Sequence, residues 1–184
     1  MPSMSIDTSL IILLICILIV AAIIDIRIRK IPNLLTYPAM IAGLVYHGVM
    51  SGPNGLFFSA GGLVLGIAIF ILPYLMGGMG AGDAKLMGAV GAVLGPSGVF
   101  NASVFTAIAG GIYALLLLPF HYRMHRGLFT RFATMIKTFA VTGLFIYIPA
   151  VENEKKPKLC YAIAIASGTL YTIWWRLYNH SLPL

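Results

Sequence analysis

Hydrophobic positions along this chain fall in long unbroken runs, and glycine, proline or charged residues separate one run from the next. The first run, residues 8–24, contains only apolar and hydroxyl side chains. At a helical rise of about 1.5 Å per residue, it approaches the roughly 30 Å hydrocarbon core of a bilayer. Five more apolar runs follow, so the pattern predicts six membrane-spanning helices. Their expected bounds are 8–24, 34–50, 56–76, 84–94, 99–120 and 159–175.

Residues that break helices, or that let helices pack closely, support these bounds. Pro32 has no backbone N–H and disfavours helix at the residue before it, so a break is expected after the first run. Turns are also predicted at residues 51–55 and 95–98, where glycine and proline cluster. Gly62 and Gly66 have the small-xxx-small spacing that allows two helices to approach closely, which predicts a packing role.

Composition places the chain in a membrane. Hydrophobic residues make up 60% of the sequence and charged residues 9%, and the mean hydropathy is +0.96. Such a chain has too little polar surface to enclose a soluble core. We therefore expect an all-α polytopic membrane protein with a single domain over residues 1–184. No basic segment precedes the first run, which favours a retained membrane span over a signal peptide.

The distribution of positive charge indicates topology rather than nucleic-acid binding. The net charge is +7, and the basic residues lie in short clusters between apolar runs, as in loops that face an anionic leaflet. With the N-terminus outside, all of the 12 lysines and arginines except Arg176 fall on the inner side. A polar stripe over residues 127–149 predicts an interfacial amphipathic helix within a cytoplasmic loop, 121–158. A seventh span at 127–149 is the alternative, but it would place Lys155, Lys156 and Lys158 outside.

Side chains that bind metals show no pattern typical of a metal centre. Cys16 and Cys160 have neither CxxC nor His/Cys ligand spacing, so neither zinc nor a disulfide framework is indicated. His121 and His125 are spaced i, i+4, but without a neighbouring thiol or carboxylate they are interpreted as a juxtamembrane pair. We therefore expect no metal and no cofactor.

Two carboxylates lie at the ends of apolar runs. The chain has five acidic residues; of these, Asp25 directly follows the first run and Asp83 directly precedes the fourth. Because the first span runs inward and the fourth starts from the inner side, both side chains are expected at the cytoplasmic boundary. An ionisable group at membrane depth costs a few kcal/mol, which makes the pair a functional-site hypothesis. The alternative is that each is a solvated charge paired with Arg27, Arg29 or Lys85.

Such a pair is suited to activating water against a peptide bond. Two carboxylates sharing a site do not both ionise readily, so one acts as a base and the other as an acid. Asp83 begins a helix and Asp25 ends one, so the helix dipoles favour Asp83 as the ionised base and Asp25 as the protonated acid. Gly80 and Gly82 permit dihedrals that other residues avoid, and they leave room for an extended substrate backbone beside Asp83.

These residues carry a resemblance to a known family. The motif Gly80-Ala81-Gly82-Asp83, followed by Ala84-Lys85-Leu86, and the earlier Asp25 with Ile31-Pro32-Asn33 resemble the prepilin peptidases, the type IV leader peptidases among the GxGD intramembrane aspartyl proteases. The resemblance extends to the closing helix, where Cys160 stands at a position that is commonly proline in the family. It implies that Asp25 and Asp83 are the catalytic pair. It also implies substrate-binding or site-shaping roles for Gly80, Gly82, Lys85, Pro32 and Asn33.

The resemblance implies a function as well. Members of this family cut the basic leader from type IV prepilins or pilin-like secretion subunits after a glycine, at the cytoplasmic side of the bacterial inner membrane. Long members carry an additional region with paired CxxC motifs and methylate the new N-terminus with S-adenosylmethionine. This sequence contains no such region, so we expect the peptidase activity alone. The implied partners are prepilin or pseudopilin substrates and anionic membrane lipid, with no nucleic acid.

Two other classes of function remain open at this stage. Paired membrane carboxylates also form ion sites in transporters, but an inverted repeat is expected there, and no matching carboxylate follows Asp83 in a second half of the chain. A structural membrane subunit of a pilus or secretion machine is the third possibility. In that case both aspartates would only pair with their neighbours.

Overall fold

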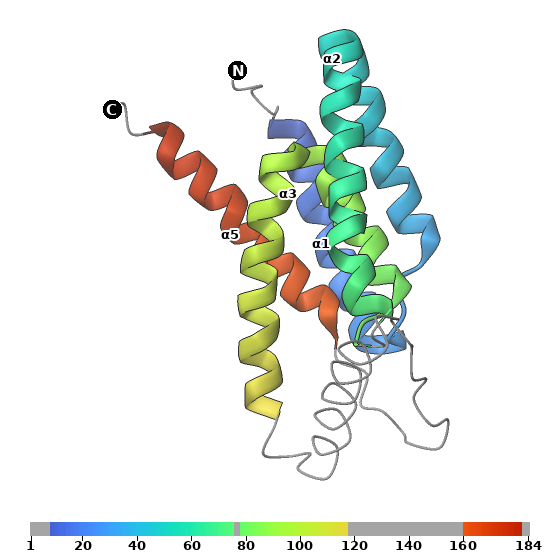
Figure 1. The fold of residues 1–184 in the computed structure, drawn as a ribbon, viewed down its shortest axis with the longest axis vertical. Coiled ribbons are helices and arrows are strands. Elements are labelled where there is room, and N and C mark those ends of the chain that lie inside the picture. The colour runs from blue at the N-terminus through green and yellow to red at the C-terminus, as the bar shows by residue number, and fades with distance from the viewer. Residues whose placement is uncertain (1–7, 76–77, 118–159, 182–184) are drawn as a thin grey trace, which may run out of the picture. The chain divides into compact units, whose positions relative to one another are not determined.

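The regular secondary structure in the described part of the chain is entirely helical. The computed structural model describes residues 8–75, 78–117 and 160–181, and every regular element in them is an α-helix (Figure 1). The helices are α1 (Thr8–Ile28), α2 (Asn33–Leu75), α3 (Ala81–Leu117) and α5 (Tyr161–Ser181). The predicted all-α class is confirmed for these residues. The predicted loop 121–158 and interfacial helix 127–149 lie outside them.

The chain divides into two compact units. One consists of Met1–Gly110 together with Lys158–Leu184, and the other of Gly111–Pro157. Of the second unit, the described residues are 111–117, which end helix α3. The first unit contains α1, α2, α5 and most of α3, including both predicted catalytic aspartates.

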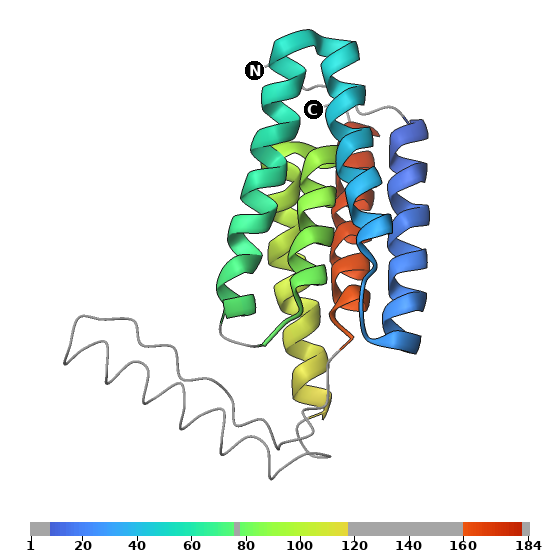
Figure 2. The same ribbon diagram turned by 90° about the vertical axis from the view of Figure 1, so that its right-hand side faces the viewer.

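Two glycines interrupt the long helices α2 and α3. Gly52 has φ 60° and ψ −146°, and Gly95 has φ 72° and ψ −177°, so both occupy the positive-φ region that favours glycine. Residues 33–51 and 53–75 consequently form two antiparallel halves of α2 (Figure 2). The predicted turns at 51–55 and 95–98 are narrower than expected. Pro53 and Pro96 continue in helix because the first helical position needs no backbone N–H.

Three of the described helices are long and apolar enough to cross a membrane. They are Thr8–Ile28, Asn33–Leu75 and Ala81–Tyr113, by length and composition. Large apolar side chains on their outer faces are exposed, for example Ile12 at 56% and Phe57 at 77%. An apolar surface of this kind fits lipid rather than water. The count of six spans stays a prediction.

Several observed helix ends lie beyond the predicted ones. Helix α1 continues past residue 24 to Ile28, and α3 begins at Ala81 rather than at residue 84. Helix α5 starts at Tyr161 and extends beyond residue 175 to Ser181. Hydrophobicity predicted the apolar centre of each helix, but backbone hydrogen bonding continues the helix beyond the first polar residue. Asp25 and Asp83 therefore lie inside terminal helical turns.

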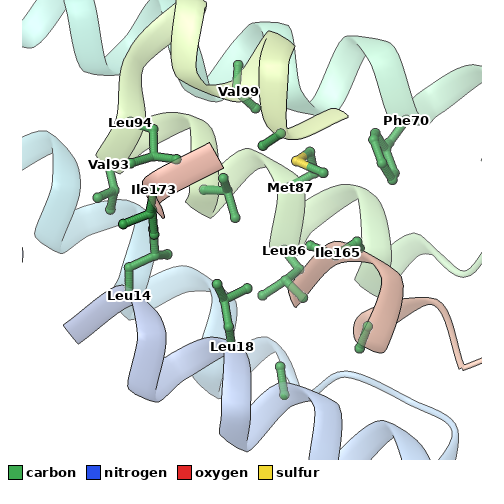
Figure 3. Packing of buried hydrophobic residues seen from close by; sticks show 14 of the residues in the cluster. Leu14, Leu18, Phe70, Leu86, Met87, Val93, Leu94, Val99, Ile165 and Ile173 are labelled. Carbon is green, nitrogen blue, oxygen red and sulfur yellow. The ribbon is translucent and has the colours of Figure 1, made fainter. Parts of the chain in front are cut away.

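The first half of α3, residues 81–94, is the buried centre of the fold. Every residue from Leu86 to Gly95 is buried. Figure 3 shows Leu86 of α3 among Leu18 of α1 and Ile165 of α5 in the apolar cluster. Because this half-helix is covered on all sides, its neighbours must approach its backbone closely.

Glycines make that close approach possible. A Cβ added at Gly62 would collide with the carbonyl group of Gly91, and one added at Gly91 would collide with the carbonyl group of Gly62. A Cβ at Gly66 would lie 2.5 Å from the carbonyl oxygen of Met87. The packing role predicted for Gly62 and Gly66 is confirmed: the second half of α2 contacts the backbone of α3 through them.

Side chains from three other segments satisfy the carbonyl groups at the end of the buried half-helix. Ser59 Oγ donates to the Ala92 oxygen at 2.6 Å, and His47 Nε2 lies 3.0 Å from the Val93 oxygen. Arg176 lies on α5, and its Nη1 donates to the Leu94 oxygen at 3.4 Å. The last carbonyls of a helix have no intrahelical partner, and positive charge is favourable beside them. His47 and Arg176 therefore share a capping role. Arg176 is the one basic residue predicted to lie outside.

The backbone contact at Gly62 predicts a large effect of a single methyl group. Gly62→Ala should lower the free energy of unfolding by about 1–3 kcal/mol, because the added carbon overlaps the α3 backbone. Unfolding in a fixed detergent, driven by heat or by SDS, measures it. Gly61→Ala is the matched control, since its Cβ would meet Pro96 Cγ at an ordinary 3.5 Å. Equal stability of both variants would contradict the close packing at Gly62.

Candidate active site

Asp25 lies in the last turn of α1, and a left-handed residue ends the helix behind it. Arg29 has φ 54°, and its N–H donates to the Asp25 carbonyl oxygen at 2.8 Å, which is the bond of an αL helix cap. The Asp25 side chain is buried, with 6% of its surface exposed. Its Oδ2 accepts a hydrogen bond from the backbone N–H of Ala162 in the first turn of α5, at 3.3 Å. Asp25 thus joins the end of α1 to the start of α5.

Asp83 lies in the first turn of α3 and caps that helix. Its Oδ2 accepts the Gly80 N–H at 2.9 Å, while its own N–H donates to the Gly80 carbonyl oxygen at 3.1 Å. This reciprocal pair resembles half of a capping box, in which an acidic side chain reaches back to the N-cap amide. The side chain is 7% exposed. Local sequence alone therefore fixes the orientation of this carboxylate.

The fold brings the two carboxylates together at one end of the first unit. There α1 ends and α2, α3 and α5 begin (Figure 2). The charge of Asp25 acts on Asp83, and both act on the thiol of Cys160, the residue before α5. Asp83 also acts on the Tyr161 hydroxyl. The site is a buried pair of carboxylates with a thiol and a phenol beside it.

The alternative of two solvated, ion-paired charges does not fit this geometry. Both carboxylates are buried, and each takes its hydrogen bond from a backbone amide. Lys85 binds other groups: its Nζ donates to Asn33 Oδ1 at 2.8 Å and lies 5.1 Å from the centre of the Tyr37 ring. The exposed Arg29 acts on Asp25 through its charge. Among the described residues, the donors to this buried carboxylate pair are amides, which leave the carboxyl groups free to exchange the protons that acid–base chemistry needs.

The remaining predicted site residues gather beside the pair, but two of them do so for a different reason than expected. Within the described residues, the glycines with positive φ are Gly52 and Gly95, so Gly80 and Gly82 do not use the positive-φ conformations that glycine permits. Gly82 is instead needed for space, because a Cβ there would lie 3.0 Å from the Cβ of Ile31. At Gly80 the nearest atom to an added Cβ would be Asp83 Oδ2, at 3.4 Å.

Pro32 and Asn33 follow Ile31, which packs against Gly82, and they form the start of α2. The Pro32 carbonyl oxygen accepts the Leu35 N–H at 3.1 Å, and the Asn33 carbonyl oxygen accepts Thr36 Oγ1–H at 3.4 Å. The Asn33 side chain receives Lys85, as described above. The loop between α1 and α2 and the start of α3 therefore hold each other in place, through one hydrogen bond and one glycine contact.

The sequence did not indicate that the Ala162 amide binds Asp25, or that Arg29 ends α1 in a left-handed conformation. Ala162 carries no side-chain chemistry, and its contact with Asp25 spans 137 positions of the chain. Nothing in the sequence signals that contact. The positive φ of Arg29 had a weak local signal, namely its place between the end of an apolar helix and Pro32. Within the described ranges, no three His, Cys, Asp or Glu side chains gather as metal ligands.

The architecture defines a class of protein: helices of membrane length and composition, with a buried pair of aspartates where four helix ends meet. Comparison with known families then assigns it. The family model described as the type IV leader peptidase family matches residues 12–115, more than half of the chain, so the chain belongs to that family. The resemblance found in the sequence is confirmed. No curated protein and no solved structure matches the chain.

The match includes both aspartates and all five predicted site-shaping residues. It ends at residue 115 and does not reach α5. The membership identifies a peptidase family, and the apolar helices agree with a membrane peptidase. The contact from Ala162 to Asp25 is therefore a feature of this structure that the family match does not cover.

The Lys85–Asn33 hydrogen bond predicts energetic coupling between the starts of α2 and α3. In a double-mutant cycle of Lys85→Met and Asn33→Ala, we expect a coupling free energy of about 1 kcal/mol, because either change alone removes the whole bond. Unfolding in one detergent measures it. Lys30→Met combined with Asn33→Ala is the control and should show additive effects. Additivity in the Lys85 cycle as well would contradict the bond.

Proposed function

We propose that this protein is a prepilin peptidase, an aspartic endopeptidase that removes the basic leader of type IV prepilins or pilin-like secretion subunits. The observation that carries the proposal is the buried pair Asp25 and Asp83, held together inside the region that matches the type IV leader peptidase family. Substrate, cut site and residue roles are part of the proposal. So is the location, a bacterial cytoplasmic membrane with the site on the cytoplasmic side, which rests on the bias of basic residues toward the inner loops.

The chemistry needs one ionised and one protonated carboxyl group. The carboxylate takes a proton from water as the water oxygen bonds to the scissile carbonyl carbon, and the carboxyl gives its proton to the carbonyl oxygen. The C–N bond then breaks as the first group returns its proton to the leaving nitrogen and the second recovers one from the diol. Both groups end as they began, and two carboxyl groups that share a site have the required difference in protonation.

The residues around the pair suit an extended peptide. Gly80 is exposed and lies directly beside the Asp83 carboxylate, so a peptide backbone can approach there without meeting a side chain. Pro32 and Asn33 are also exposed, and they directly follow Ile31, the residue that packs against Gly82. The Lys85 ammonium donates one hydrogen bond to Asn33, and an ammonium has three donors. These groups are proposed to position the substrate, while anionic lipid holds the basic leader near the surface.

Replacing either aspartate tests the proposal. Asp25→Asn and Asp83→Asn should each insert at normal levels and lower cleavage of a prepilin by at least about 100-fold, because an amide neither accepts nor donates the required proton. Proteoliposome cleavage followed by mass spectrometry measures both the rate and the cut position. Asp7→Asn is the matched control: it changes the one other aspartate of the sequence and should leave cleavage normal. Retained cleavage in either site variant would remove that residue from the pair.

The same mass spectra test the two finer parts of the proposal. The product should begin directly after a glycine, and with S-adenosylmethionine present its new N-terminus should stay unmethylated. A methylated product would overturn the expectation of a peptidase alone. If cells carrying either aspartate variant processed prepilin normally but assembled pili poorly, the result would instead support a structural subunit.

A further inference from the structure

The carboxylate of Asp25 lies on the N-terminus of a second helix. Ala162 is the second residue of α5, and amide groups in the first turn of a helix have no intrahelical partner. This one donates to Asp25 Oδ2 at 3.3 Å, and the Ala162 side chain is 0% exposed. The donor is therefore held in a buried position, with the positive end of the α5 dipole directed at Asp25.

The charged and titratable groups around the pair are unequal in their effect on the two aspartates. Arg29, which follows α1, places its positive charge near Asp25. Cys160, before α5, and Asp83, on α3, are the other titratable groups that act with Asp25. Tyr161 acts with Asp83. On the side of α2, the charge of Lys85 is engaged by Asn33 and Tyr37.

The helix-end difference that the sequence suggested is thereby reduced, because Asp25 ends α1 but also lies at the start of α5. Among the described residues, Asp83 has one amide donor, Gly80 before α3 at 2.9 Å, and Asp25 has one, Ala162 at the start of α5 at 3.3 Å. Nearby positive charge favours Asp25: the Arg29 N–H is bound to the Asp25 carbonyl oxygen at 2.8 Å, and the Arg29 cation acts on the Asp25 carboxylate. A nearby opposite charge favours the ionised form of a carboxyl group.

We infer that the Ala162 N–H and the Arg29 charge hold the negative charge of the pair on Asp25, so that Asp25 is the base and Asp83 the acid. This inference rests on the proposed function and reverses the assignment expected from the sequence. Asp25 then takes the proton from water, and Asp83 protonates the scissile carbonyl oxygen, with both protons restored as the C–N bond breaks. Ala162 and Arg29 act as positioning groups, through Asp25.

The inference has a specific consequence for the pH–rate profile. Cleavage requires the singly protonated pair, so its acid limb reports formation of the first charge and its alkaline limb the second. If the first charge lies on Asp25, losing the Ala162 N–H makes that charge harder to form, and only the acid limb moves up. If it lies on Asp83, only the alkaline limb moves up. The two assignments therefore predict shifts in opposite limbs.

Ala162→Pro removes this donor while keeping the helix start, because proline is accepted in the first turn of a helix. We expect the acid limb of kcat/KM to move up by about one pH unit, with the alkaline limb in place. Ala162→Val is the matched control: it adds as many heavy atoms as proline but keeps the N–H, so both limbs should stay. A shifted alkaline limb would overturn the assignment. Two unmoved limbs in Ala162→Pro would overturn the role of Ala162.

The exposed Arg29 provides a second test that does not depend on how proline is accommodated. Arg29→Gln should move the acid limb up by less than Ala162→Pro does, and the shift should shrink at high salt because exposed charges are screened. Arg29→Lys should restore the original limb. Lys30→Gln, at the neighbouring exposed cation, should leave it in place. An unmoved acid limb in Arg29→Gln would overturn the charge placement.

A measurement without substrate separates this inference from the proposed function. In the Asp83→Asn protein, infrared spectra recorded over pH follow protonation of the Asp25 carboxyl. Adding Ala162→Pro should move its midpoint up by about one pH unit, and an unmoved midpoint would overturn the inference. If both aspartate-to-asparagine variants still cleaved, the proposed function would fail. The infrared titration would still report whether Ala162 holds charge on Asp25.

Discussion

Residues 81–94 of α3 are buried along almost their whole length, and a helix buried in apolar surroundings must still find partners for the amides and carbonyls at its two ends. An unpaired backbone group costs several kcal/mol away from water. At the carbonyl end, Ser59, His47 and Arg176 supply donors from α2 and α5. At the amide end, Asp83 supplies an acceptor to the turn at Gly80. Polar side chains from α2, α3 and α5 therefore serve both ends of one half-helix, and the proposed active site is one of those ends.

Burying this half-helix also determines how near its neighbours must lie. Gly62 and Gly91 remove the side chains that would separate α2 from α3, and Gly82 does the same where α3 meets the loop at Ile31. The last contact brings the end of α1, which carries Asp25, within electrostatic reach of Asp83. Close packing of backbones is thus a condition for the carboxylate pair, because bulkier residues at these glycines would move the two helix ends apart.

The groups that hold the pair are amides, and amides do not change charge with pH. Among the described residues, Asp25 and Asp83 each receive one such donor, and the titratable groups beside the pair there include Cys160 and Tyr161. A lysine or arginine bonded directly to both oxygens of either group would fix its charge and prevent proton exchange. The fold avoids this: Lys85 is bound by Asn33 on α2.

The amino-acid sequence by itself determined the helical class, the breaks at Gly52 and Gly95 and the close packing at Gly62, because each follows from local chemistry or from the period of an apolar helix. It also singled out Asp25 and Asp83, since carboxylates beside apolar runs are costly. It did not show that Gly82 is needed for space against Ile31, because such a need depends on what lies opposite and not on the glycine.

The tertiary structure alone decided which groups meet. Ala162 and Asp25 are 137 positions apart, Arg176 and Leu94 are 82 apart, and Lys85 and Asn33 are 52 apart. No periodicity encodes such pairs, because they depend on which helices pack side by side and at what depth each begins. For this reason the sequence placed Asp25 only at the negative end of its own helix, whereas the fold also places it at the positive end of another.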